Sequence, residues 1–249
     1  MTSFAIAKTP ASSRRTPNSL LESDEVLVTP VAGALAIPSF VVDHASFRRW
    51  ARSDDYPRHG RFAWLNGMIW MDFMVEQVFS HNTVKNEFIA ALVRHVNKYK
   101  LGHLLSDRVL VSNDKVGLSA EPDVLFVSYE SETSGRVHFK ESASTGAIEV
   151  EGTPDMTLEV VSDSSVTKDT VNLKSLYFEA GVQEYWVVDA RRGTAKFTIL
   201  KRGSRGFIPV TPSADGFARS VVFGAGVRLR VKQGPTKRPI YSVTIKRMS

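Results

Sequence analysis

The chain has 249 residues, no cysteine and a formal net charge of +6. Without cysteine there can be no disulfide framework, thiolate zinc site, iron–sulfur cluster or cysteine nucleophile, so any metal must bind to oxygen or imidazole ligands. No run reaches the roughly 18 uncharged apolar residues that a membrane span needs, and charged residues and a proline interrupt the N-terminal stretch where a signal peptide would lie. The sequence therefore predicts a cytoplasmic protein with no membrane partner.

The charge is distributed unevenly along the chain. Residues 191–249 contain 14 Lys and Arg against the single acid Asp215, which leaves 18 basic and 25 acidic residues in residues 1–190, so the two parts carry +13 and −7. A basic end of this kind can supply affinity for phosphates without sequence recognition. It indicates a nucleic-acid partner, although a solvated, charged edge sheet would have the same composition.

The N-terminal region differs in composition from the rest of the chain. Residues 1–38 are rich in Ser, Thr, Pro and Ala without a sustained period, so we expect a flexible arm. We expect residues 39–232 to form a single domain and residues 233–249 a basic C-terminal tail. The first element of the domain is expected to be a short helix over residues 42–51.

A β-hairpin and a long helix are expected next. Residues 61–66 and 68–74 flank Asn66-Gly67, and this dipeptide is the strongest short hairpin signal. Apolar residues then recur at spacings of three and four, which predicts a helix over residues 81–99 with Ser80 as its N-cap. Its apolar stripe consists of Val84, Phe88, Ala91, Leu92, Val96 and Tyr99.

Strands and one further helix make up the second half of the domain. The strands are expected over residues 104–111, 124–128, 156–162 and 184–188. The Ser-, Thr-, Gly- and Glu-rich stretch between residues 130 and 152 is expected to be a surface loop.

The second helix is bounded by clear signals. Asp163-Ser164-Ser165 favours a helix start, and Gly181 favours a helix end. The expected buried stripe is Leu173, Leu176, Tyr177 and Ala180. Turns beyond residue 190 predict an antiparallel meander, so the whole order predicts a mixed α/β fold.

Two carboxylates interrupt apolar strands. Asp123 stands at the mouth of the apolar run Val124–Val127, and Glu159 lies in the middle of residues 156–161. Burying an ionised carboxylate costs several kcal/mol unless it is paired or coordinated. If the two strands are neighbours, both carboxylates can bind one hard cation such as Mg²⁺, which Mn²⁺ can replace. Taken alone, Asp123 could instead be a strand-entry cap.

The pattern around these carboxylates resembles a known family. The pattern consists of His81, Pro122-Asp123-Val124, residues 158–165, Lys168-Asp169, Tyr177, Ala180-Gly181-Val182, Glu184-Tyr185-Trp186 and Asp189. In this order it is similar to the restriction-endonuclease-like Uma-two family. That family belongs to the PD-(D/E)xK nuclease superfamily. The resemblance implies a restriction-endonuclease-like mixed sheet flanked by helices, here with an added N-terminal β-hairpin and C-terminal antiparallel strands. It also implies a metal-dependent phosphodiesterase with Asp123 and Glu159 as the motif carboxylates and metal ligands.

The superfamily's lysine is not at its usual place. It normally follows the Glu by two residues, but here that position is Val161. The resemblance implies that the following helix supplies it, which offers Lys168 and Lys174. On an ideal helix Lys174 lies about 110° from the centre of the buried stripe, from where a long side chain can reach the sheet. We predict Lys174 as the catalytic lysine and Lys168 as the next candidate, although both could be solvated.

Other residues carry weaker signals. Glu76 or Glu87 could supply an additional carboxylate, although the sequence favours a solvated side chain for both; His81 matches the family pattern but could equally be an ordinary helix-start histidine. We interpret Tyr185-Trp186 as core together with part of an interface, which with the C-terminal meander could form a homodimer.

Three functions fit these observations. The first is a Mg²⁺-dependent endonuclease acting on DNA. The second is a nucleic-acid-binding protein of the same fold with a decayed catalytic site, suggested by Val161. The third is a structural or assembly domain, because a fold alone does not determine function.

Overall fold

The computed structural model describes residues 36–142 and 146–247. The expected arm, residues 1–38, lies almost entirely outside the described residues. The helices are α1 (His44–Ala51), α2 (Thr83–Tyr99), α3 (Tyr129–Thr133) and α4 (Leu173–Ala180), with π-helical turns η1 (Val78–Asn82) and η3 (Lys168–Asn172) and 3₁₀ turns η2 (Asp114–Val116) and η4 (Arg191–Gly193). In the described part of the chain no helix is long and apolar enough to cross a membrane.

A six-stranded mixed sheet, the central sheet, carries the candidate site. Its strands, in spatial order, are β12 (Phe207–Pro209), β11 (Lys196–Arg202), β10 (Glu184–Asp189), β9 (Met156–Val160), β6 (Val124–Ser128) and β3 (Gly102–Ser106). The pair of β9 and β10 is parallel, and every other neighbouring pair is antiparallel. Helix α2 packs on this sheet through Phe88 and Leu92, which share a buried cluster with Phe126 and Trp186.

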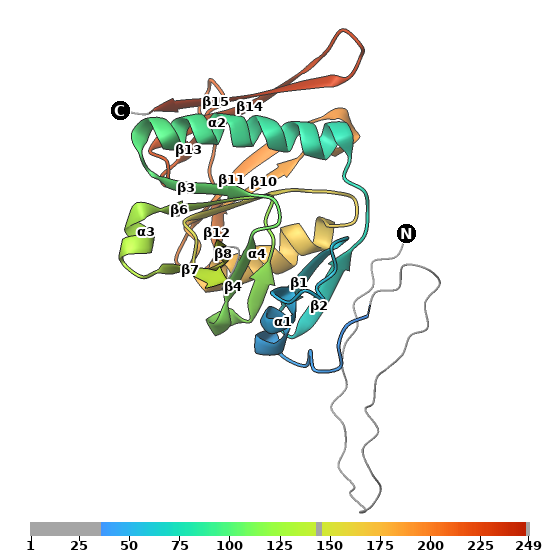
Figure 1. The fold of residues 1–249 in the computed structure, drawn as a ribbon. Coiled ribbons are helices and arrows are strands. Elements are labelled where there is room, and N and C mark those ends of the chain that lie inside the picture. The colour runs from blue at the N-terminus through green and yellow to red at the C-terminus, as the bar shows by residue number, and fades with distance from the viewer. Residues whose placement is uncertain (1–35, 143–145, 248–249) are drawn as a thin grey trace, which may run out of the picture.

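A second six-stranded sheet, the lateral sheet, lies on the other side of α4. Its strands, in spatial order, are β2 (Met68–Asp72), β1 (Arg61–Leu65), β5 (Leu118–Ala120), β4 (Leu110–Asn113), β8 (Gly146–Gly152) and β7 (Val137–Ser142). Leu173, Leu176 and Tyr177 of α4 are buried together with Leu118 of the lateral sheet and Tyr185 of the central sheet. The central sheet therefore has α2 on one face and α4 on the other (Figure 1).

The C-terminal strands form a third, antiparallel sheet. It consists of β13 (Ala218–Ser220), β14 (Ala225–Gln233) and β15 (Pro239–Arg247). Figure 1 shows the β14–β15 hairpin running alongside α2, with its turn rising away from the helix. Most of the segment predicted as a basic C-terminal tail is thus strand β15, fully paired with β14.

The mixed α/β fold class is confirmed, as are several local predictions. Asn66 and Gly67 both have positive φ in the turn between β1 and β2, as a two-residue hairpin requires. Gly181 ends α4 with φ 97°. In α2, Val84, Phe88, Ala91, Leu92 and Val96 are buried.

Three local predictions are wrong. The surface loop expected between residues 130 and 152 is α3 followed by the hairpin of β7 and β8. The strand expected over residues 104–111 is two strands, because Asp107 and Arg108 adopt positive φ and turn the chain between β3 and β4. Ser80 is not an N-cap, because the helix already begins in η1.

Candidate active site

Asp123 and Glu159 come together at one edge of the central sheet. Val124 of β6 pairs with Leu158 of β9 in antiparallel register, which makes Asp123 and Glu159 the next residues along the two strands. Each side chain is only 2% exposed. Oδ2 of Asp123 accepts a hydrogen bond from the backbone N–H of Val160 at 2.8 Å, so it is tied to the strand of Glu159. The structure thus brings the two predicted carboxylates together.

The two carboxyl groups have opposite pKa shifts. Burial favours the neutral form of Asp123, but His81, Arg61 and the Val160 N–H outweigh it and hold the pKa of Asp123 well below its usual range. Burial raises the pKa of Glu159 to about 8; Lys168 opposes this rise, and the charges of Asp169 and Asp123 add to it. At neutral pH one carboxyl is charged and the other retains its proton in large part, which is the state expected of two acids that compete for too little positive charge.

Lys168 lies beside these acids. Its Nζ is 3.9 Å from Oε2 of Glu159 and 3.1 Å from Oδ1 of Asp169, and it lies 4.6 Å from the centre of the Trp70 ring. The side chain is buried, and the negative charges of Asp169 and Glu159 outweigh the effect of burial, so the pKa of Lys168 is raised. The ammonium group is therefore charged next to Glu159.

Lys174 is not brought to the carboxylates. It is half-buried on α4, and within residues 36–142 and 146–247 no ion pair joins it to Asp123 or Glu159. The physical reason lies in η3, because a π-helical turn contains more residues than an α-helical turn and rotates the preceding positions. The projection at 100° per residue, which favoured Lys174, therefore does not hold for residues before Leu173.

Two tyrosines fix the positions of the acidic groups. The Tyr177 hydroxyl donates to Oε1 of Glu159 at 3.1 Å, and the Tyr185 hydroxyl donates to the backbone carbonyl of Asp169 at 2.8 Å. Both tyrosines are fully buried. Since Tyr177 lies on the buried stripe of α4, the packing of that helix sets the orientation of Glu159.

A second charged group adjoins Asp123 from the other side. Nδ1 of His81 lies 2.6 Å from Glu76, and its Nε2 lies 3.3 Å from Asp123. Nζ of Lys85 is 2.7 Å from Glu76, and Arg61 contacts both Asp123 at 3.2 Å and Glu76 at 3.5 Å. Glu76, His81 and Asp123 place potential ligand atoms within 4.8 Å of one another. Lys85 and Arg61 both contact Oε1 of Glu76, whereas Asp123 also lies beside Glu159 of the neighbouring strand, so Asp123 is the member of this group that can share a cation with Glu159.

Sequence reasoning missed Arg61, Lys85 and Asp169. Lys85 did carry a signal, because it lies four residues after His81 and three before Phe88 on the buried side of the helix. Arg61 had none, since an arginine at the start of a strand is ordinary. Of the two weaker glutamates, Glu76 is brought to the site.

The other weak signals resolve differently. Glu87 is half-exposed on α2 and lies in no ion pair among the described residues. Tyr185 and Trp186 are both fully buried. These two side chains are core, so neither supplies the interface that we expected from them.

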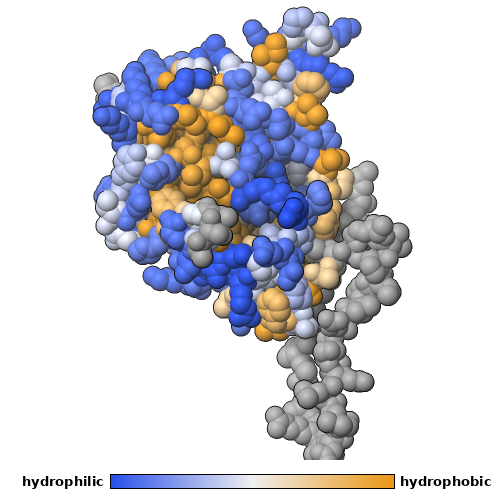
Figure 2. Space-filling model, in the orientation of Figure 1, coloured by the Kyte–Doolittle hydropathy of each residue, from blue (hydrophilic) through white to orange (hydrophobic). Residues whose placement is uncertain are grey.

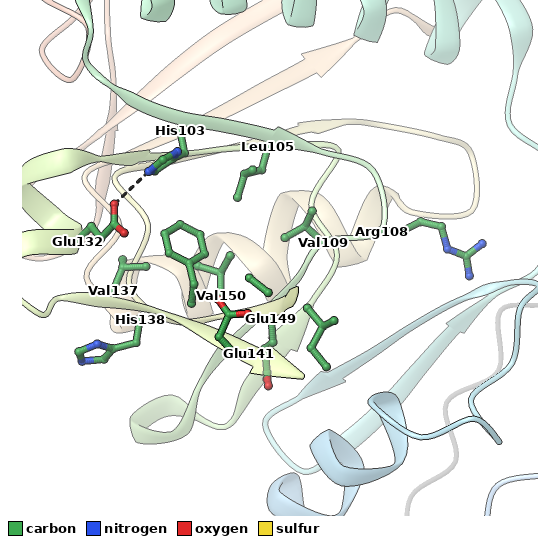
Figure 3. A pocket seen from close by; sticks show the side chains of 13 residues that line it. His103, Leu105, Arg108, Val109, Glu132, Val137, His138, Glu141, Glu149 and Val150 are labelled. Atoms are coloured by element: carbon green, nitrogen blue, oxygen red, sulfur yellow. Dashed lines mark hydrogen bonds and ion pairs between the residues drawn. The ribbon is translucent and has the colours of Figure 1, made fainter. Parts of the chain in front are cut away.

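A pocket lies away from the carboxylates. A cavity of about 840 Å³ opens between β3 of the central sheet and β7 and β8 of the lateral sheet. Figure 3 shows His103 and Glu132 facing each other at one end, joined at 3.0 Å, while Arg108 points away at the other. Its apolar lining includes Leu105, Phe139 and Val150. Figure 2 shows hydrophobic side chains gathered on this face, over the region where β3 and β7 lie in Figure 1.

The candidate site thus lies at one edge of a mixed sheet that has a helix on each face. Residues 45–232 match the model of the Uma2 family, described as "Putative restriction endonuclease", and the chain belongs to this family. Among solved structures, it is similar to a nuclease of the DUF820 group from Anabaena variabilis, itself described as putative, with 15% identity and a TM-score of 0.49. That match covers 65% of this chain and 82% of the other. None of the curated proteins compared with the chain matches it.

Proposed function

We propose that the protein is a Mg²⁺-dependent endonuclease of the PD-(D/E)xK type that hydrolyses phosphodiester bonds of DNA. One observation carries the proposal: Asp123 and Glu159 are buried at the edge of paired strands with the Lys168 ammonium group 3.9 Å from Glu159. Burying two carboxylates and a lysine costs desolvation free energy. Groups buried in this way are concentrated at functional sites. Membership of a restriction-endonuclease family supports the same chemistry.

The residues fit a divalent cation. Asp123 and Glu159 offer hard oxygen ligands, and the mutual repulsion that helps to raise the pKa of Glu159 is the unfavourable energy that a cation would offset. Bound there, Mg²⁺ would supply a Lewis acid that lowers the pKa of a water molecule and stabilises negative charge on a phosphate. Mn²⁺ has the same preference for oxygen ligands and can replace it.

The chain's own groups have separable roles in this proposal. Lys168 is the charged donor closest to Glu159 and stabilises the charge that develops on the phosphate. Tyr177 and Arg61 are positioning residues, because they hold Oε1 of Glu159 and Oδ1 of Asp123. The basic strands beyond residue 190 bind the DNA backbone.

The test is nicking of supercoiled plasmid DNA by the full chain in Mg²⁺ or Mn²⁺, with EDTA as the control. We expect cleavage that EDTA abolishes. Glu159→Gln keeps the shape but leaves a side chain that cannot ionise to bind a cation, so it should abolish cleavage while the metal-free protein unfolds at a temperature no lower than the parent. Full cleavage by this variant in Mg²⁺ would exclude Glu159 as a ligand.

The remaining outcomes separate the alternatives. Salt-dependent DNA retention without cleavage in either metal would indicate a nucleic-acid-binding protein with a decayed site. Absence of both would indicate a structural domain.

Oligomeric state and location complete the proposal. We propose a homodimer that covers the apolar pocket face between β3 and β7, since contiguous exposed apolar surface commonly marks a protein interface. Sedimentation of the parent and of a Phe139→Ser variant tests this, with a shift to monomer expected for the variant. A DNA substrate and a chain without cysteine both suit the cytoplasm.

A further inference from the structure

An unusual group of apolar side chains is exposed between β2 and η1. Val75 is 89% exposed and Met74 is 65% exposed, and three further large apolar residues of the same segment are also on the surface. We call this group the apolar rim; it consists of Phe73, Met74, Val75, Val78 and Phe79. Exposed apolar residues that occur singly need no explanation, but five within seven positions indicate a binding surface.

The apolar rim is held against the candidate active site at several points. Asp72, at its start, accepts a hydrogen bond at 2.8 Å from Ser164, in the loop that follows the strand of Glu159. Glu76, in its middle, is bound by Lys85 and Arg61. His81, just after it, contacts Asp123. The polar residues of this segment thus face the site and hold the backbone, which leaves the apolar side chains outside at the edge of the site.

Positive charge lies next to the apolar rim. The β14–β15 hairpin, residues 225–247, contains seven Lys and Arg and no acid. The guanidinium of Arg238, in the turn of this hairpin, lies 5.0 Å from the centre of the Phe79 ring. A ligand on the apolar rim therefore contacts apolar side chains and lies close to the Arg238 guanidinium. This combination suits an aromatic base attached to a phosphate.

We infer that the apolar rim binds unpaired bases of a DNA strand whose phosphates contact the β14–β15 hairpin and extend to the carboxylates. This inference rests on the proposed function, because it names the substrate class of the same site. In duplex DNA the bases are stacked inside and the phosphates lie outside, so an apolar rim gains little from an intact duplex. A strand with exposed bases can place them on Phe79 and its neighbours while its backbone follows the basic hairpin.

The test measures binding by the full chain in EDTA, where no cleavage occurs. Fluorescein-labelled single-stranded DNA and a duplex of the same sequence are titrated, and the anisotropy is followed as a function of salt. Phe79→Ala should weaken single-strand binding about tenfold, because base stacking on the ring is lost. The duplex affinity should change less than about twofold, and the salt slope should stay at the parental value because no phosphate contact is removed.

Matched variants separate stacking from folding. Phe79→Trp keeps an aromatic ring and should retain single-strand binding. Met74→Ser with Val75→Ser changes the two most exposed residues of the apolar rim, both outside any helix. This double variant should also weaken binding of single-stranded DNA without weakening binding of the duplex. Ile208→Ser changes an exposed apolar residue on the outer strand β12 and should have no effect.

Three results would overturn the inference. One is parental single-strand affinity in both rim variants, and another is an equal loss on single strand and duplex. The third is a rim variant that sediments as a smaller species than the parent but binds DNA as the parent does, because the apolar rim would then contact a second copy of the chain. Failure of the nuclease proposal looks different, since it would leave the single-strand preference intact while plasmid cleavage in Mg²⁺ is absent.

Discussion

Lys168 is buried between two carboxylates, and its position changes the expectation for catalysis. Nζ is closer to Asp169, at 3.1 Å, than to Glu159, at 3.9 Å, so Asp169 holds the ammonium group while Glu159 remains near it. The Trp70 ring covers the same group. A lysine held in this way keeps its charge and costs little reorganisation when negative charge develops nearby.

Replacing each lysine in turn tests this assignment. Lys168→Met should lower the cleavage rate in Mg²⁺ about a hundredfold or more, because it removes a preorganised cation. Lys174→Met is the matched control on the same helix and should cleave at close to the parental rate. Plasmid nicking rates at saturating metal, with unfolding temperatures measured in parallel, give the comparison. A large loss only in Lys174→Met would restore the role that periodicity predicted for it.

The raised pKa of Glu159 predicts a pH-dependent stability in the absence of metal. The group has a pKa of about 8 in the folded chain against 4.5 ordinarily, so between these values the folded state binds more protons than the unfolded state. The free energy of unfolding therefore falls as pH rises from about 5 to about 8, and the contribution of Glu159 is lost above that range. Asp123, whose pKa is lowered, stays ionised throughout this window and adds no slope.

Urea unfolding in EDTA across this pH range measures the slope. Glu159→Gln should flatten it, although Asp169, whose pKa is also raised, should retain part of it. Mg²⁺ should stabilise the parent most at the alkaline end, where Glu159 is ionised, and should stabilise the variant less. A parental slope in Glu159→Gln would show that Glu159 is not the group that titrates.

At the scale of elements, the helices and the first hairpin could be predicted from local signals in the sequence. Strands β7 and β8 could not, because they depend on partners far away along the chain. The hairpin at Asn66-Gly67 and the end of α4 at Gly181 depend on residues within one turn of the chain. Strands β7 and β8 depend on a partner far away, because Arg48 of α1 donates to the buried carboxylate of Glu149 at 2.7 Å across 101 residues. Without that arginine, the glutamates of β8 indicate a solvated loop.

The candidate site shows the same division. Asp123 and Glu159 could be predicted because a carboxylate in an apolar strand is visible in the sequence. The choice between Lys168 and Lys174 could not, since it depends on the π-helical turn η3, and nothing in the local sequence distinguishes that turn from an α-helix. The register shift between Lys140 and Glu141 similarly hid the alternation of β7.

The contact between α1 and the lateral sheet provides a prediction at this scale. Arg48→Met should lower the free energy of unfolding by about 3 kcal/mol, because it leaves Glu149 buried without its main partner. Burial favours the neutral form of Glu149, but hydrogen bonds and charge from Arg48 hold the pKa of Glu149 below its usual range. Chemical denaturation of the purified chain measures the loss.

Two further variants identify the cause of that loss. Arg48→Met with Glu149→Gln should recover much of it, because no buried charge is left unpaired. Arg52→Met removes the less buried arginine at the same carboxylate and should cost less. No coupling between Arg48 and Glu149 in this cycle would mean that the arginine acts through packing alone.

At the scale of the whole molecule, the charge is separated along the chain, and buried hydrogen bonds attach the C-terminal sheet to the central sheet. Glu184 of β10 is fully buried and accepts hydrogen bonds from Trp186 at 2.9 Å, from Ser220 at 2.7 Å and from the Val221 N–H at 2.6 Å. These bonds join the third sheet to the strand beside β9. The third sheet, which carries the basic hairpin, is thus anchored to the strand next to that of Glu159.

The last prediction tests whether the +13 segment binds phosphates. Arg230 and Lys232 are exposed and alternate along β14, so they share one face, whereas Arg228 packs 4.2 Å from the Phe217 ring and is left unchanged. Changing Arg230 and Lys232 to Gln should weaken DNA binding on every sequence alike, and should lower the slope of log K against log salt by about 0.9 per lost contact on duplex DNA. The matched control changes Lys115 and Lys140, two exposed lysines outside the third sheet, to Gln and removes the same net charge. A lower slope in the hairpin variant alone would place phosphates on β14. An equally lower slope in both double variants would mean that the effect comes from net charge alone. A parental slope in both would show that the basic face is only solvated.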